Sequence, residues 1–162
     1  MSVERSFLEF STNKLQQMTS HIHDCFSQLD DELIWRRESS ENSLGNLVLH
    51  LCGNVRQWIG CYVGGLEDIR KRPEEFSPDA RLDRTALLAL LDQTIGSAVL
   101  ILQQVEPARL ADRIPVQDGR VTSVLEAIYQ VVGHFQQHTG QIIFATKLWT
   151  GKDLGFYRPP SR

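Results

Sequence analysis

The stretch that decides the fold lies at residues 43–63 and reads SLGNLVLHLCGNVRQWIGCYV. Its one charged residue is Arg56, although a helix at a protein surface normally presents a charged face. Ser43 is a favourable residue for capping the start of a helix, and Gly64-Gly65 follows as a stop signal. The pattern predicts a helix from Ser43 to about Val63 that other parts of the protein cover on most sides.

A second helix with few charges is predicted from about Ser123 to Trp149. Glu126 follows Ser123 by three residues, which is the relation found in a capping box. Apart from Glu126, the segment has one charged residue, Lys147. We therefore expect this helix, like the first, to be covered on most sides.

Two further segments carry apolar residues at helical spacing, one at about Val3–Leu29 and one from near Asp83 to just before Pro107. Strand-like alternation is nearly absent, apart from a minimal hairpin that residues 113–116 and 120–122 could form. Four long helices with connections that can cross the end of a bundle predict an all-α fold, a four-helix bundle. We expect a single domain over residues 1–162.

The longest charged connection is Glu67–Arg81, which contains Pro73 and Pro78. Charged side chains and prolines leave such a segment little to bury. We therefore expect this linker to be among the most mobile parts of the protein.

Composition narrows the classes of partner. The chain has 162 residues, of which 41% are hydrophobic, and a formal net charge of −3. This charge is too mild to indicate nucleic acid or a membrane surface as a partner. We see neither a signal peptide nor an apolar run of the length that a membrane span needs, so a cytoplasmic location is expected. The three cysteines, without a C-x-x-C pair, are expected to be buried thiols.

Polar residues gather in one narrow stripe on each of the two helices that have few charges. At about 100° per residue, the stripe of the first helix contains His50, and that of the second contains His134 and His138. If the two stripes face each other, they form a polar pocket inside an apolar bundle. His134 and His138 are at positions i and i+4, which places both imidazoles on one helix face.

The three histidines are candidate ligands of one divalent metal ion. A ligating imidazole is neutral and needs a partner that orients its other nitrogen. The alternative is three core histidines that hydrogen bond to nearby amides and bind no metal. The residues expected to orient the histidines are Asn46, Asn54, Gln130 and Gln141, each about one turn from a histidine.

Several other kinds of site do not fit. The stretch from His134 to His138 lacks the glutamate that a zincin protease uses as its general base. The Glu-x-x-His pairs of di-iron bundles are also absent. His21 and His23, two residues apart on a predicted helix, cannot share a face and are expected at the surface. No acidic residue is placed by the sequence as an obvious base.

The histidine pattern resembles that of the DinB-like superfamily of metal-binding four-helix proteins. The stretch SLGNLVLHLCGN at residues 43–54 is similar to the helix-two signature of one uncharacterised DinB-like subfamily. Residues 72–76 and the stretch HTGQI at residues 138–142 are also similar to sequences of that subfamily. The resemblance implies a bundle with up-down-down-up topology, a nickel or zinc ion on the three histidines, and often a homodimer. Related enzymes use low-molecular-weight thiols, as in bacillithiol S-transferases and mycothiol-dependent maleylpyruvate isomerase.

These features favour a metal-dependent thiol S-transferase as the function. Three histidine ligands leave open positions on the ion, where a thiol of low molecular weight can bind and ionise. Trp58 and Phe135 are expected as apolar walls of the substrate pocket. Two alternatives remain open: the same site could activate water in a hydrolase, or the protein could be a non-enzymatic metal-binding or stress-response module.

A homodimer is also expected, because the helices with few charges could exceed what one bundle can cover. The residues expected beneath a partner subunit are Leu49, Cys52, Ile143 and Phe144.

Overall fold

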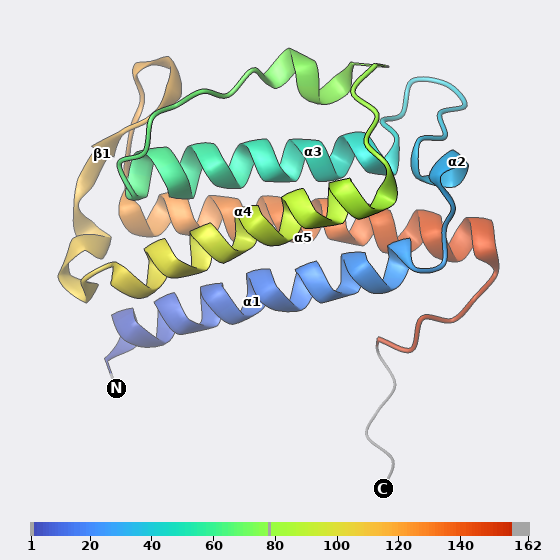
Figure 1. Ribbon diagram of the computed structural model, residues 1–162. Coiled ribbons are helices and arrows are strands. Elements are labelled where there is room, and N and C mark those ends of the chain that lie inside the picture. The colour runs from blue at the N-terminus through green and yellow to red at the C-terminus, as the bar shows by residue number, and fades with distance from the viewer. Residues whose placement is uncertain (1, 78, 157–162) are drawn as a thin grey trace, which may run out of the picture.

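The computed structural model describes residues 2–77 and 79–156, and these are mostly helical. Long helices lie side by side with their axes roughly aligned (Figure 1). They are α1 (Val3–Phe26), α3 (Leu44–Val55) with its continuation η1 (Arg56–Val63), α4 (Arg84–Gln104) and α5 (Val124–Thr150). In Figure 1, α1 and α5 run in one direction, and α3 and α4 run in the other.

Short elements join the long helices. They are α2 (Asp31–Ile34), η2 (Arg72–Phe76), η3 (Pro107–Ala111), β1 (Arg113–Pro115), η4 (Gln117–Gly119) and β2 (Val121–Ser123). The two strands pair antiparallel with Ile114 opposite Thr122, which confirms the predicted hairpin. The turn between them places Asp118 at φ 61° and Gly119 at φ 70°, a conformation that Gly and Asp adopt more readily than most residues.

The predicted starts of the helices are confirmed by their caps. The Ser43 hydroxyl accepts a hydrogen bond from the Asn46 backbone N–H at 3.1 Å. Ser123 and Glu126 form the predicted capping box, with the Ser123 N–H donating to Glu126 Oε2 at 2.7 Å. Gly151 at φ 66° ends α5 in the left-handed conformation.

Two helix ends differ from the prediction. The first helix ends at Phe26 rather than at Leu29. The helix that begins after Ser43 is α-helical only to Val55 and then continues as a π-helix through Val63. The N–H of Gly64 accordingly bonds to the carbonyl of Ile59, five residues back. Such wider turns occur often near functional sites, and here the π-helix carries Trp58.

The core lies where α5 packs against α1 and α3, and α4 packs against the same two helices. Its largest fully buried side chains include Leu15, Phe26, Leu51, Leu91 and Phe135. Among the described residues, α4 is long and apolar enough to cross a membrane by length and composition, which corrects the expectation that no run of this kind exists. One third of that apolar window, 33%, is buried, and Leu87, Leu91 and Leu102 of α4 belong to the core.

The linker from Glu67 to Arg81 lies over α3 and packs against it through η2 (Figure 1). The expectation that this segment has little to bury is wrong for two of its residues. The Arg70 side chain is 6% exposed and that of Glu75 is 10% exposed. Pro78 lies outside the described residues.

Of the residues expected beneath a partner subunit, Cys52 and Ile143 are already buried by their own chain, and Leu49 is half-buried. Phe144 is 69% exposed, and Leu148 one turn later on α5 is 68% exposed. Two of the four residues are thus buried without a partner subunit.

One close contact ties the start of α3 to α2. The Trp35 ring lies against Gly45, and a Cβ at Gly45 would stand 2.7 Å from ring carbons. The Trp35 indole N–H donates to the carbonyl of Leu82 at 2.9 Å, so the ring also fixes the end of the linker.

We expect Gly45→Ala to lower the free energy of unfolding by about 1 to 3 kcal/mol, because the added methyl group displaces the Trp35 ring. The matched control is Gly96→Ala on α4, where a Cβ would meet nothing within 4 Å. That change should stabilise the protein by about 0.5 to 1 kcal/mol, since alanine favours a helix interior. Urea denaturation of both variants checks this, and equal effects would contradict the packing at Gly45.

Candidate metal centre

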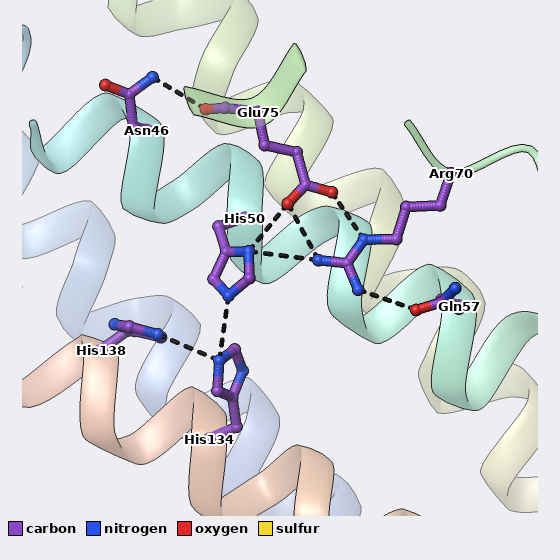
Figure 2. A network of polar contacts seen from close by, with 7 residues as sticks. All are labelled: Asn46, His50, Gln57, Arg70, Glu75, His134 and His138. Carbon is purple, nitrogen blue, oxygen red and sulfur yellow. Dashed lines mark hydrogen bonds and ion pairs between the residues drawn. The ribbon is translucent and has the colours of Figure 1, made fainter. Parts of the chain in front are cut away.

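Three histidines meet between α3 and α5. His50 comes from α3, and His134 and His138 come from α5, as Figure 2 shows. The Nε2 atom of His134 lies 3.1 Å from Nε2 of His50 and 3.1 Å from Nε2 of His138. Because the candidate ligand atoms all lie within 4.8 Å of one another, the three side chains could hold a metal ion. The two polar stripes thus face each other, as the sequence predicts.

The hydrogen bonds of the outer ring nitrogens determine where the protons lie. His50 Nδ1 is 2.8 Å from Glu75 Oε2, and His138 Nδ1 is 2.6 Å from Gln141 Oε1. An ionised carboxylate and an amide oxygen only accept hydrogen bonds, so both Nδ1 atoms carry the proton. The Nε2 atoms of His50 and His138 then have lone pairs that point toward His134.

His134 cannot satisfy both of these lone pairs with one proton. Its own Nδ1 is buried and has no hydrogen-bond partner among residues 2–77 and 79–156. A neutral imidazole has one N–H, so a proton on either nitrogen leaves another nitrogen without a partner. A cation that accepts three lone pairs suits this arrangement, and the donor set therefore fits a divalent metal. Of the three histidines, His138 bonds to an amide, whereas within the described residues His50 and His134 do not.

The linker supplies the residue that orients His50. Glu75 is in η2, and its carboxylate receives Arg70 Nε at 2.7 Å and Arg70 Nη2 at 2.9 Å, besides the bond from His50. Arg70 Nη2 also comes within 3.2 Å of His50 Nδ1, but both carry protons, so this contact is not a hydrogen bond. Arg70 Nη1 donates to Gln57 Oε1 at 2.9 Å. Figure 2 shows this group beside His50.

These contacts keep Glu75 ionised. Burial by itself raises the pKa of Glu75, but hydrogen bonds from Arg70 and His50, together with the charge of Arg70, outweigh it and lower the pKa below its ordinary value. The carboxylate therefore accepts from His50 at neutral pH and holds the imidazole in one tautomer.

Two residues of α3 position Glu75, one by leaving space for it and one by a hydrogen bond. A Cβ at Gly53 would overlap the Glu75 carboxylate, so only glycine fits there without displacing it. Asn46 Nδ2 donates to the Glu75 backbone carbonyl at 2.8 Å. The residues on either side of His50 in the sequence, Asn46 and Gly53, thus help to position the linker on α3.

Of the four residues expected to orient the histidines, one does so in the structure. Gln141 bonds to His138, as expected. Within the described residues, Asn46 makes no hydrogen bond to His50; it donates to the backbone carbonyl of Glu75, whose carboxylate pairs with His50 instead. Asn54 and Gln130 line the adjacent pocket, and within the described part of the chain neither bonds to a histidine. A carboxylate from the linker, that of Glu75, already occupies the hydrogen-bonding position beside His50 Nδ1.

Sequence reasoning missed Arg70 and Glu75. Two signals were available: the opposite charges of Arg70 and Glu75 at a separation of five residues, and the position of Glu75 within residues 72–76, which resemble the DinB-like subfamily. The sequence also did not predict that Phe76 packs near His50, where their ring centroids lie 5.0 Å apart.

Burial keeps the histidines of α5 neutral. It is the largest cause that lowers the pKa of His134, to about 4; the positive charge that His138 and His50 would gain on protonation, and the charges of Arg70 and Arg72, add to the effect. Burial also lowers the pKa of His138, against the bond to Gln141, which raises it. Neutral imidazoles at pH 7 are the form that binds metal.

A pocket of about 740 Å³ opens beside the histidines. We call it the histidine pocket, and its lining includes His50, His134, Asn54, Trp58, Arg70, Arg72, Val116, Gln117, Asp118, Arg120, Val121, Thr122 and Gln130. Trp58 is thus a wall, as expected. Phe135 is not, because its side chain is fully buried in the core. On α5 the two positions adjacent in sequence, 134 and 135, point to different sides of the helix.

Comparison with known proteins adds the family. A family model described as "Protein of unknown function (DUF1572)" matches residues 2–157. The chain belongs to this family. Among curated proteins, none matches it.

Solved structures similar to this family member share its fold. A conserved protein from Enterococcus faecalis has a TM-score of 0.74 at 16% identity, covering 94% of this chain and 99% of that one. The mycothiol-dependent maleylpyruvate isomerase has a TM-score of 0.64 at 15% identity, covering 90% of this chain and 70% of that one. An alanine mutant of that isomerase is similar at 14% identity with the same TM-score of 0.64. The mostly helical fold is consistent with the DinB-like fold.

Without bound metal, the protein should lose stability as the pH falls from about 6.5 to about 4. His134 in the unfolded chain takes up a proton near its ordinary pKa of 6.5, whereas the folded chain takes it up only near 4. The unfolded state then binds more protons, so stability falls with pH in this window. Melting temperatures after chelation check this, and His134→Asn should flatten the slope. An NMR titration that placed the His134 pKa near 6.5 would contradict it.

Proposed function

We propose that this protein is a metal-dependent thiol S-transferase built on a DinB-like four-helix bundle with up-down-down-up topology. In this proposal His50, His134 and His138 hold one divalent ion, nickel or zinc. The observation that carries it is the convergence of three Nε2 atoms beside a pocket of about 740 Å³. Such a pocket can admit a small molecule to the ion, which a purely structural metal site does not require.

A bound ion with three histidine ligands supplies open positions and lowers the pKa of a thiol or a water that reaches it. The residues of the chain prepare the site for that ion. Glu75 and Gln141 fix the protons on the outer nitrogens of His50 and His138, so both inner nitrogens can bind. Trp58 gives the pocket an apolar wall beside these polar groups.

The reacting thiol has to come from outside the chain. The cysteines are Cys25, Cys52 and Cys61, and none lines the histidine pocket. Burial raises the pKa of the Cys25 thiol to about 11 and that of the Cys52 thiol to about 12. Burial also raises the pKa of Cys61. Because the thiolate is the nucleophile, these side chains are poor candidates for it.

The choice of a thiol as co-reactant is supported by fold similarity. One of the similar structures is an isomerase described as mycothiol-dependent. We propose a low-molecular-weight thiol as the second reactant here.

Loading the protein with zinc or nickel, followed by elemental analysis, should give about one ion per chain. His134→Ala leaves two ligands and should lower the affinity by at least about 100-fold. The matched control is His21→Ala on α1, which lies outside the site and should bind as wild type does. Failure to bind any divalent ion, or unchanged affinity in His134→Ala, would contradict the proposal.

The reaction itself is tested with the loaded protein and a panel of cellular thiols offered together with an electrophilic acceptor such as a chloroarene. Thiol consumption that depends on both metal and His134 supports a transferase. Hydrolysis of ester substrates without thiol consumption would instead assign the site to water activation.

Glu75→Ala should weaken metal affinity by about 10- to 100-fold, because His50 loses the group that fixes its proton and orientation. The matched control is Glu74→Ala, whose side chain is 71% exposed and pairs with Lys71 at the surface. Affinities from competition with a chelating dye check this. Equal effects of the two changes would show that Glu75 does not act through His50.

A further inference from the structure

The charged residues that line the histidine pocket are unequal in sign. Three are arginines, Arg70, Arg72 and Arg120, and one is an acid, Asp118. The whole chain carries a formal net charge of −3, so the pocket is locally opposite in sign to the protein. An excess of one charge at the wall of a cleft raises the local concentration of oppositely charged ligands.

The three arginines differ in how far they are neutralised. Arg70 is buried and donates to Glu75 and Gln57, so its charge is already paired. Arg72 is exposed, and its guanidinium lies 5.5 Å from the centroid of the Phe76 ring. Within residues 2–77 and 79–156, Arg72 has no ion pair.

In the part of the chain that the structure describes, the one ion pair of the Arg120 side chain is weak. Its Nη2 is 3.8 Å from Asp118 Oδ2, and the two side chains are 61% and 80% exposed. An ion pair of this length and exposure contributes little, so the Arg120 guanidinium remains available to a ligand. Arg72 and Arg120 come from different elements, the linker and the hairpin, and both line the pocket beside His134.

A second feature of the pocket also lacks a partner. Asn54 is 9% exposed and lines the pocket, and its Oδ1 is buried with no hydrogen bond in the described chain. A buried amide without a partner is costly. A ligand with a hydroxyl or N–H group could satisfy it, and the apolar Trp58, Val116 and Val121 would contact the body of such a ligand.

We infer that the histidine pocket binds an organic anion, a small molecule with a carboxylate or phosphate group that Arg72 and Arg120 hold. Guanidinium groups bind both oxyanions through paired N–H donors. The volume of about 740 Å³ is in the range of small-molecule sites, and it exceeds the need of an inorganic ion. The inference rests on the proposed function, because it names the class of substrate that the site takes.

Arg72 lines the same pocket as His50 and His134. An anion beside Arg72 would therefore lie close to the three histidines.

The test uses three probes that differ in charge: benzoate, the neutral benzamide and phenyl phosphate. Binding to the full chain is followed by the NMR signal of the Trp58 indole N–H, assigned with Trp58→Phe. We expect benzoate or phenyl phosphate to bind about tenfold or more tightly than benzamide. The tighter of the two anions identifies the group as carboxylate or phosphate.

Variants assign the preference to residues. Arg72→Gln and Arg120→Gln should each weaken anion binding roughly fivefold to tenfold, and the double variant should bind benzoate no better than benzamide. Asp118→Asn should strengthen anion binding. The matched control is Arg109→Gln, an exposed arginine on η3 that pairs with Asp112 and lies outside the pocket. Its binding should match that of the wild type.

Binding of both benzoate and phenyl phosphate no tighter than that of benzamide, or an unchanged anion preference in the double variant, would overturn the inference. A loss of binding in Arg109→Gln as large as in the pocket variants would do the same. All titrations are made on chelated and on metal-loaded protein. If the chelated protein prefers anions but the protein never takes up metal, the proposed function is refuted and the anion site stands. If the protein takes up metal but shows no anion preference, the inference is refuted and the proposed function stands.

Discussion

The burial of the Arg70–Glu75 ion pair against His50 is the constraint on which the site depends. Two charges removed from water are stable only when every donor and acceptor has a partner. Here Glu75 receives bonds from Arg70 and His50, and Arg70 also donates to Gln57. Because these contacts cross from the linker to α3, they dock the linker, orient a histidine and complete a wall of the pocket at once.

The same docking explains why α3 has so few charges. A helix without charges has to be covered, and the sequence suggested a second subunit as the cover. In the structure the linker lies over α3 through η2 and brings Phe76 within 5.0 Å of the His50 ring. The charges of the linker suggest a solvent-exposed segment. In the structure, Arg70 and Glu75 are buried beside His50, whereas other charged residues, such as Lys71 and Glu74, stay at the surface.

Local patterns made much of the fold and part of the site predictable. Capping residues placed the starts of α3 and α5, and helical periodicity brought His50 opposite His134 and His138. Periodicity could not find Glu75, because its partner is 25 residues away in sequence and on another element. It also misplaced Phe135, because a residue beside a polar stripe can face the core as well as the pocket. The π-helix at Arg56–Val63 escaped prediction because the apolar pattern continues through it.

The linker contacts also define a spacing that can be read in other sequences. Arg70 follows His50 by 20 residues, and Glu75 follows it by 25. Gly53, three residues after the histidine, leaves the space that the carboxylate fills. A relative with histidine, glycine, arginine and glutamate at these intervals would be expected to seat its linker in the same way. One that keeps the three histidines but lacks the arginine and the glutamate would have to orient its first histidine by other means, and the two groups could be sorted by inspection of an alignment.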